Sequence, residues 1–332
     1  RAYRMAKLIG GLGSSHVPSI GAALDKGLAE TADWKPFFDG TLPGKRWVEA
    51  AKPDVAIVIF NDHGNAFFLD KVPTFAVGCA ESYAPIDEGW GPRSIPAFEG
   101  HADLGWHIAD TLVENRFDPM VVREIEVDHG LQVPMELFFG RPEKAWPVKV
   151  VPVFVNVIQF PIPLPERCYE LGKALRRAIE SFPGDERVVI IGTGGLSHQL
   201  QGSRAGFVNP EADQEFLVDI AANPQKLAAM SRQDYVRLYG SEGAEMMMWL
   251  TMRGAMDENL SHAPIPCTND ATSARINANN PSSGIIFLHS PRHFRRHVIF
   301  VVLGQYFGRY KCSIIHHAGR DQPADQLHFV LR

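Results

Sequence analysis

The chain has 332 residues, of which 45% are hydrophobic and 21% are charged, the balance of a globular protein that can bury its own core. Its formal net charge of -5 gives no bulk electrostatic argument for a nucleic-acid or acidic-lipid partner. Four scattered cysteines form no C-x-x-C pair, no secretory signal is visible, and no apolar run reaches the ~18–20 residues that cross a bilayer. We therefore expect a cytoplasmic protein with reduced cysteines.

Short runs rich in β-branched residues alternate along the chain with amphipathic segments. The runs predict buried strands at Ala6–Gly10, Val55–Phe60, Lys149–Val157 (broken by its internal proline) and Val188–Ile191. The amphipathic segments predict helices at Asp103–Glu114, Pro165–Phe182 and Ser241–Ala255, the last with its serine as N-cap. This alternation favours an α/β fold: a single domain with a mixed, largely parallel central sheet flanked by helices.

Histidines follow the predicted strands. His16, His63 and His198 each come just after a buried strand, and His129 follows a further β-branched stretch. Sites in α/β sheets form beyond the carboxyl ends of the strands, so these side chains could converge there. A single loop histidine is more often a structural hydrogen-bonding residue than a ligand. Several histidines at one sheet edge make a metal or proton-transfer site about as reasonable an interpretation as a structural role.

A carboxylate ligand could come from Glu242 or Glu245 at the start of the last predicted helix. Two histidines and a carboxylate form the facial triad of non-haem Fe(II) oxygenases, although the same set could hold zinc for a hydrolase. The residues alone do not decide between an iron oxygenase and a zinc hydrolase. They also leave open a binding protein that keeps the fold but has lost the metal. The glycines at 192–195 are interpreted as room for backbone to approach the site closely.

Longer motifs add a family resemblance from about Met5 to Met256. They are Ser15–Pro18, Asn61–His63, Tyr83–Arg93 (YAPIDEGWGPR), Val127–Gly130, Gly192–Gly206 (GTGGLSHQLQGSRAG) and Ser241–Ala255 (SEGAEMMMWLTMRGA). With these motifs the chain resembles the catalytic beta subunits of the protocatechuate 4,5-dioxygenase family, the type II extradiol ring-cleaving dioxygenases.

The resemblance implies roles for individual residues. It implies that His16, His63 and Glu245 bind Fe(II) and that His198 is the catalytic acid/base. It places His129 and Asn61 near the substrate. Glu242 then lies behind the ligands or, as we prefer, is a favourable charge at a helix start.

The resemblance also implies an activity. We expect extradiol (meta) cleavage of protocatechuate by O2 to 4-carboxy-2-hydroxymuconate semialdehyde, in the catabolism of lignin-derived aromatic compounds. Gallate or 3-O-methylgallate is the alternative substrate, and a zinc-dependent hydrolase is a more distant alternative. The family works with a small helical alpha subunit, so we expect such a partner and a homo- or hetero-oligomer.

The end of the chain departs from this pattern. We expect a catalytic domain over residues 5–258 and a divergent tail over 259–332, which we hypothesise to be non-native, for example the product of a shifted reading frame. Thr268 and Asn269 faintly echo the family's substrate-contacting motif and are expected to bind the substrate carboxylate.

Overall fold

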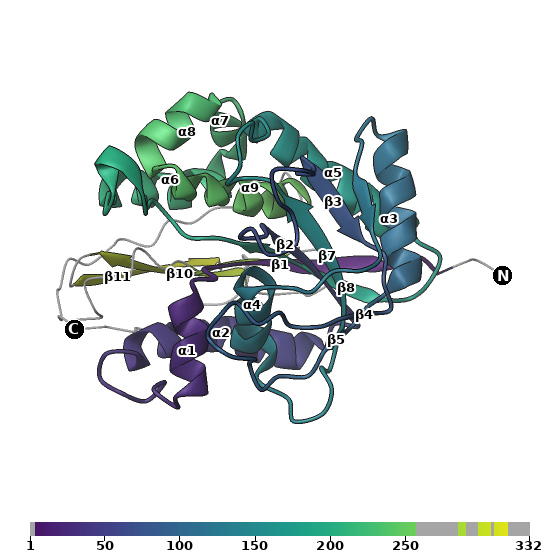
Figure 1. Cartoon of the computed structure of the whole chain (residues 1–332), viewed down its shortest axis with the longest axis horizontal. Coiled ribbons are helices and arrows are strands. Elements are labelled where there is room, and N and C mark those ends of the chain that lie inside the picture. The colour runs from purple at the N-terminus through teal and green to yellow at the C-terminus, as the bar shows by residue number, and fades with distance from the viewer. Residues whose placement is uncertain (1–3, 257–284, 290–297, 307–308, 318–332) are drawn as a thin grey trace.

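The structure is a computed structural model that describes residues 4–256 and the strands at 285–289, 298–306 and 309–317. Six strands of the first range form a twisted sheet in the order β6-β3-β7-β2-β8-β1 (Figure 1). They are β1 (Lys7–Ser14), β2 (Val55–Phe60), β3 (Phe75–Gly78), β6 (Met120–Val122), β7 (Lys149–Val155) and β8 (Arg187–Thr193). Strands β1, β8, β2 and β7 are parallel to one another, whereas β3 and β6 run the opposite way. The predicted α/β fold with a mixed, largely parallel sheet is confirmed.

Helices cover both faces of the sheet, so the central strands are buried on both sides (Figure 1). One face carries α3 (Ala102–Glu114), α5 (Pro165–Ser181), α6 (Pro210–Ala222), α7 (Pro224–Ala228), α8 (Arg232–Tyr239) and α9 (Met246–Gly254). The other carries α1 (Pro18–Asp25), α2 (Lys35–Ala51) and α4 (His129–Phe139). Each layer has its own apolar core, with Leu175 and Trp249 in the first and Ile20, Phe37 and Phe138 in the second.

Smaller elements complete the described chain. Strands β4 (Ser82–Tyr83) and β5 (Phe98–Glu99) pair with each other, and short 3-10 helices lie at η1 (Gly202–Arg204) and η2 (Glu242–Glu245). Strand β9 (Ile285–His289) adds antiparallel to β1, while β10 (Val298–Tyr306) and β11 (Arg309–His317) form a separate antiparallel pair. The rest of the tail lies outside the described residues, so its proposed boundary and origin stay predictions. No helix of the described ranges is both long and apolar enough to cross a membrane.

Strand β7 is continuous, which corrects the prediction that Pro152 breaks it. The carbonyl of Val150 accepts the backbone N–H of His101, so Val150 and, two residues on, Pro152 turn their peptide groups away from β2. On that side the ladder to β3 covers only Val153–Val155. The missing N–H of the proline therefore costs no ladder hydrogen bond.

The last predicted helix also begins differently. Residues Glu242–Glu245 form a 3-10 turn, and the α-helix starts at Met246. Ser241 is not an N-cap, because its hydroxyl donates to the carboxylate of Glu242 at 2.6 Å. The stretch before His129 is no strand either, since Val127 makes only an isolated bridge to Pro85. His129 instead opens helix α4.

Candidate metal centre

Three neighbouring strands deliver the predicted histidines to one edge of the sheet. His16 follows β1, His63 follows β2, and His198 follows β8, the strand between them. All three strands are parallel, so their carboxyl ends lie side by side. Glu245 reaches the same point from the end of η2. The structure therefore brings these four residues together, as the sequence predicts.

His16 is held in a single tautomer by a buried relay. The hydroxyl of Thr193 donates to the carbonyl of Ile59 at 3.0 Å. Its oxygen is then an acceptor for Nδ1–H of His16, also at 3.0 Å. Nε2 of His16 consequently carries a lone pair, and it is buried without a hydrogen-bond partner. Burial lowers the pKa of His16, which favours this neutral form.

His63 is oriented in the same way by a carboxylate. Its Nδ1 donates to Asp128 at 2.9 Å, and its backbone N–H donates to the same oxygen at 2.8 Å. Burial alone would lower the pKa of His63, but the carboxylates of Asp128 and Glu245 outweigh it and raise the pKa to about 10. Burial would raise the pKa of Asp128, yet the contacts with His63 hold it well below its usual range. A carboxylate that fixes the far nitrogen of an imidazole is typical of metal-ligating histidines, and a metal that binds Nε2 takes the place of the proton there.

Glu245 is the carboxylate on which both imidazoles converge. One of its oxygens lies 3.2 Å from Nε2 of His16 and 3.5 Å from Nε2 of His63. Its other oxygen accepts the backbone N–H of Gly195 at 2.7 Å. Burial tends to raise the pKa of Glu245, but the neighbouring histidines hold it well below its usual range.

This donor set fits a divalent metal ion. The lone pair of His16 Nε2 faces an ionised carboxylate oxygen at 3.2 Å in no hydrogen-bond geometry. Two electron-rich atoms so placed in a buried site favour a positive charge between them. One nitrogen from each of His16, His63 and His129 also lies within 4.8 Å of the others. Of the two candidates for a third ligand, Glu245 would fit better than His129, because it places an ionised oxygen in contact with both imidazoles.

Three further residues face this centre. His198 is buried and donates Nδ1–H to the carbonyl of Leu196 at 2.7 Å, while its Nε2 lies 3.9 Å from Glu245. His129 stacks on His63 with ring centroids 3.9 Å apart. The amide nitrogen of Asn61 lies 3.1 Å from Nε2 of His63, and its amide oxygen is buried without a hydrogen-bond partner.

The glycines after β8 make room for Glu245. A Cβ on Gly194, whose φ is +131°, would lie 2.7 Å from the Cβ of Glu245. A Cβ on Gly195 would lie 2.7 Å from the ring of His198. No other residue type fits this close approach without displacing the ligand. Gly194 and Gly195 therefore agree with the interpretation of this run from sequence, whereas a Cβ on Gly192 would meet helix α9 at Met248 and Trp249.

Other predicted residues lie elsewhere. The carboxylate of Glu242 accepts the backbone N–H of Leu200 at 3.0 Å and the hydroxyl of Ser241, so it joins the loop after β8 to the start of η2. Thr268 and Asn269 lie outside the described residues. Sequence reasoning missed Asp128 and Thr193, which orient the two histidines. Asp128 could have been suspected as the N-cap of α4, because its side chain accepts the N–H of Gly130.

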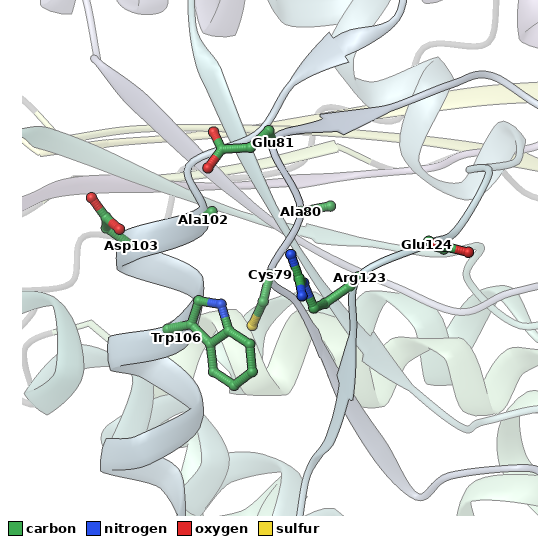
Figure 2. Close-up of a pocket in the computed structure, with 8 residues that line it drawn as sticks. All are labelled: Cys79, Ala80, Glu81, Ala102, Asp103, Trp106, Arg123 and Glu124. Atoms are coloured by element: carbon green, nitrogen blue, oxygen red, sulfur yellow. The ribbon is translucent and has the colours of Figure 1, made fainter.

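A separate cavity of about 530 Å³ lies between the end of β3 and the start of α3 (Figure 2). Trp106 and the guanidinium of Arg123 flank the thiol of Cys79 there. None of the residues that line it belongs to the histidine cluster, and burial raises the pKa of the Cys79 thiol to about 11. A thiol with so high a pKa is a poor nucleophile at neutral pH, so the histidine cluster, and not this cavity, is the candidate site.

Comparison with known proteins agrees with this geometry. A family model described as the catalytic LigB subunit of aromatic ring-opening dioxygenase matches residues 10–274. This range contains all the residues of the cluster. The match is to a dioxygenase, so it gives no support to the zinc hydrolase.

Curated relatives carry related names. A gallate dioxygenase of Pseudomonas putida is 48% identical over 174 residues, which are 52% of this chain and 51% of that protein. Two 2,3-dihydroxyphenylpropionate/2,3-dihydroxicinnamic acid 1,2-dioxygenases are each 31% identical. The one from Photorhabdus laumondii matches over 54% of each chain, and the one from Rhodococcus rhodochrous over 63% of this chain and 64% of that protein. The chain thus spans about half the length of the first of these relatives.

Proposed function

The chain belongs to the family of catalytic LigB subunits of aromatic ring-opening dioxygenases, and we propose that it is an Fe(II)-dependent extradiol dioxygenase of aromatic catabolism whose substrate is gallate. His16, His63 and Glu245 are the proposed metal ligands. The observation that carries the proposal is the convergence of two oriented Nε2 atoms on one ionised carboxylate oxygen. Two imidazoles and a carboxylate are the ligand set of non-haem Fe(II) oxygenases.

Fe(II), when bound, would supply adjacent positions for the ring oxygens and for O2 and would lower the pKa of the ring hydroxyls. The protein's own part is orientation and proton transfer. Thr193 and Asp128 occupy the far nitrogens of the two imidazoles and so aim the ligand nitrogens at the centre. His16 and Glu245 are buried and the side chain of His63 is about one fifth exposed, so water has limited access to compete with the substrate.

His198 is the proposed catalytic acid/base. The carbonyl of Leu196 occupies its Nδ1–H, so Nε2 is the nitrogen that takes a proton from the substrate hydroxyl and later returns it. His129 and Asn61 are proposed to contact the substrate from the side of His63. Thr268 and Asn269 stay proposed contacts of its carboxylate.

The sequence motifs alone favour protocatechuate as the substrate. The similarity to known proteins favours gallate instead. The 48% identity to a gallate dioxygenase supports the trihydroxy acid. Protocatechuate remains the second candidate because of the motif at Tyr83–Arg93. The two acids differ by one hydroxyl, and an apolar wall rejects an extra hydroxyl only weakly. A small helical partner subunit, as the family resemblance implies, is part of the proposal.

The test is anaerobic Fe(II) reconstitution followed by O2 uptake with gallate and protocatechuate in parallel. Uptake that needs Fe(II) and is faster with gallate supports the proposal, and the yellow semialdehyde reports protocatechuate cleavage. Uptake with neither acid, with and without a helical partner subunit, would contradict the activity. His16→Ala is the matched variant, because it removes one proposed ligand and should abolish both Fe(II) retention and uptake.

A further inference from the structure

Glu88 holds His129 with both of its carboxylate oxygens. One oxygen accepts from Nδ1 of His129 at 2.5 Å, and the other accepts the backbone N–H of the same residue at 3.0 Å. About one tenth of each side chain is exposed, so water competes weakly for these contacts. The proposed mechanism gives Glu88 no role.

The loop that carries Glu88 is fixed on both sides of it. Before it, the backbone N–H of Ile86 donates to the carbonyl of Val127 at 3.0 Å. After it, the guanidinium of Arg93 forms an ion pair with the buried carboxylate of Glu136 in helix α4, the helix that His129 opens. Glu88 therefore meets His129 in a geometry set by the surrounding structure and not by its own flexibility.

We propose that Glu88 is a positioning residue that fixes His129 as the Nδ1–H tautomer and so presents Nε2 as a hydrogen-bond acceptor for a hydroxyl of the aromatic substrate. The substrate part of this inference rests on the proposed function. The ring of His129 stacks on His63, and one of its nitrogens lies within 4.8 Å of those of His16 and His63. Since Glu88 occupies Nδ1, Nε2 is the nitrogen available to the site.

The chemistry explains why a carboxylate stands at this position. The backbone N–H and Nδ1–H of His129 are both donors, and an ionised glutamate offers two acceptor oxygens and no donor. A glutamine offers one acceptor oxygen and an NH2 group. With its oxygen on the backbone N–H, that NH2 group faces Nδ1 and favours the opposite tautomer, in which Nε2 carries the hydrogen. In Glu88→Gln, Nε2 of His129 should therefore change from a hydrogen-bond acceptor to a hydrogen-bond donor toward the substrate.

The first experiment reads the tautomer without any turnover. The full chain is labelled with 15N-histidine, kept metal-free or loaded with diamagnetic Zn(II), and the ring nitrogens of His129 are assigned by their loss in His129→Phe. We expect the Nδ1–H tautomer in the wild type, the Nε2–H tautomer in Glu88→Gln, and return of Nδ1–H in Glu88→Asp, which again offers two carboxylate oxygens. An unchanged tautomer in Glu88→Gln, or Nε2–H in the wild type, would overturn the proposal.

The second experiment separates binding from chemistry in the Fe(II)-loaded enzyme. Loss of one buried acceptor should raise KM for the aromatic acid by about tenfold or more in Glu88→Gln, with a smaller change in kcat and the same Fe(II) content. Glu126→Gln is the control, because it makes the same charge change at an exposed side chain three residues before His129. A switched tautomer with unchanged KM would overturn the substrate contact.

The two experiments fail separately. If the wild type cleaves neither acid, the proposed function fails while the tautomer still decides whether Glu88 positions His129. If the wild type is active and Glu88→Gln merely destabilises the fold, its melting temperature and metal content fall together while its His129 tautomer stays that of the wild type. Glu88→Asp then restores the melting temperature and the metal content. That result would reduce Glu88 to a structural residue and overturn the inference.

Discussion

Asp128→Asn should weaken both the fold and the metal centre by amounts that follow from its contacts. Three donors meet one oxygen of Asp128: the backbone N–H and Nδ1–H of His63 and the amide of Asn65. The other oxygen accepts the N–H of Gly130 and so caps helix α4. An asparagine has a single acceptor oxygen, which will face the three donors, and its NH2 group will then face Gly130.

The loss of the cap costs about 1 kcal/mol, and replacing a charged by a neutral acceptor at His63 costs about 1 kcal/mol more. With an unfolding entropy of about 2.1 cal/mol/K per residue, a loss of about 2 kcal/mol should lower the melting temperature of this 332-residue chain by about 3 °C. Metal affinity should fall by about 10–100-fold, as for other residues that orient a metal-bound histidine. The assays are thermal unfolding of the metal-free protein and chelator competition for Fe(II) under anaerobic conditions.

Ser231→Ala controls for the capping part of this prediction. Ser231 caps helix α8 by accepting the N–H of Asp234 at 3.0 Å, away from the histidine cluster. The Ser231→Ala variant should lose about 1 kcal/mol of its free energy of unfolding and keep its metal affinity. If Asp128→Asn loses stability but binds Fe(II) as tightly as the wild type, the carboxylate does not tune His63 and the reasoning on its orientation is wrong.

The other expected outcomes concern the acid/base, the glycine run and a buried thiol. His198→Phe should retain Fe(II) but lose turnover by ~10²–10⁴-fold, and normal O2 uptake would end its proposed role. Gly194→Ala should displace Glu245, because the new Cβ would lie 2.7 Å from the Cβ of Glu245, and metal analysis should then find less Fe(II). Gly206→Ala is the control: Gly206 also has a positive φ, but its Cβ would lie in open space, so this variant should keep the metal. Cys79, whose thiol pKa is raised by burial to about 11, should resist iodoacetamide at pH 8 until the protein unfolds; mass mapping that finds it modified in folded protein would contradict this.

The strands and the convergence of the histidines could be predicted because local patterns encode them. Val55–Phe60 is apolar throughout since both faces of β2 are covered, and its predicted bounds agree with the structure. His16 and His198 were expected at one edge because parallel strands present their carboxyl ends together. The neighbouring order of β2, β8 and β1 is set by long-range pairing that no short pattern carries.

The residues that orient the histidines could not be predicted for the same reason. Asp128 reaches His63 across 65 positions of sequence, and Thr193 reaches His16 across 177. Asp128 could be suspected as a helix N-cap, but nothing local to either residue marks it as the partner of a histidine. The η2 turn was read as the start of a helix because glutamates at a first turn suit both structures.

The relay from His16 through Thr193 to Ile59 has a consequence for the order in which the protein is made. It joins the ends of three strands that leave the ribosome far apart in time, and the carboxylate of Glu245 is synthesised later still. A nascent chain that stops before Glu245 holds both of the proposed histidine ligands but lacks the proposed anionic one. The complete ligand set proposed for the metal therefore exists only once Glu245 has been synthesised, after all three strands that carry the histidines.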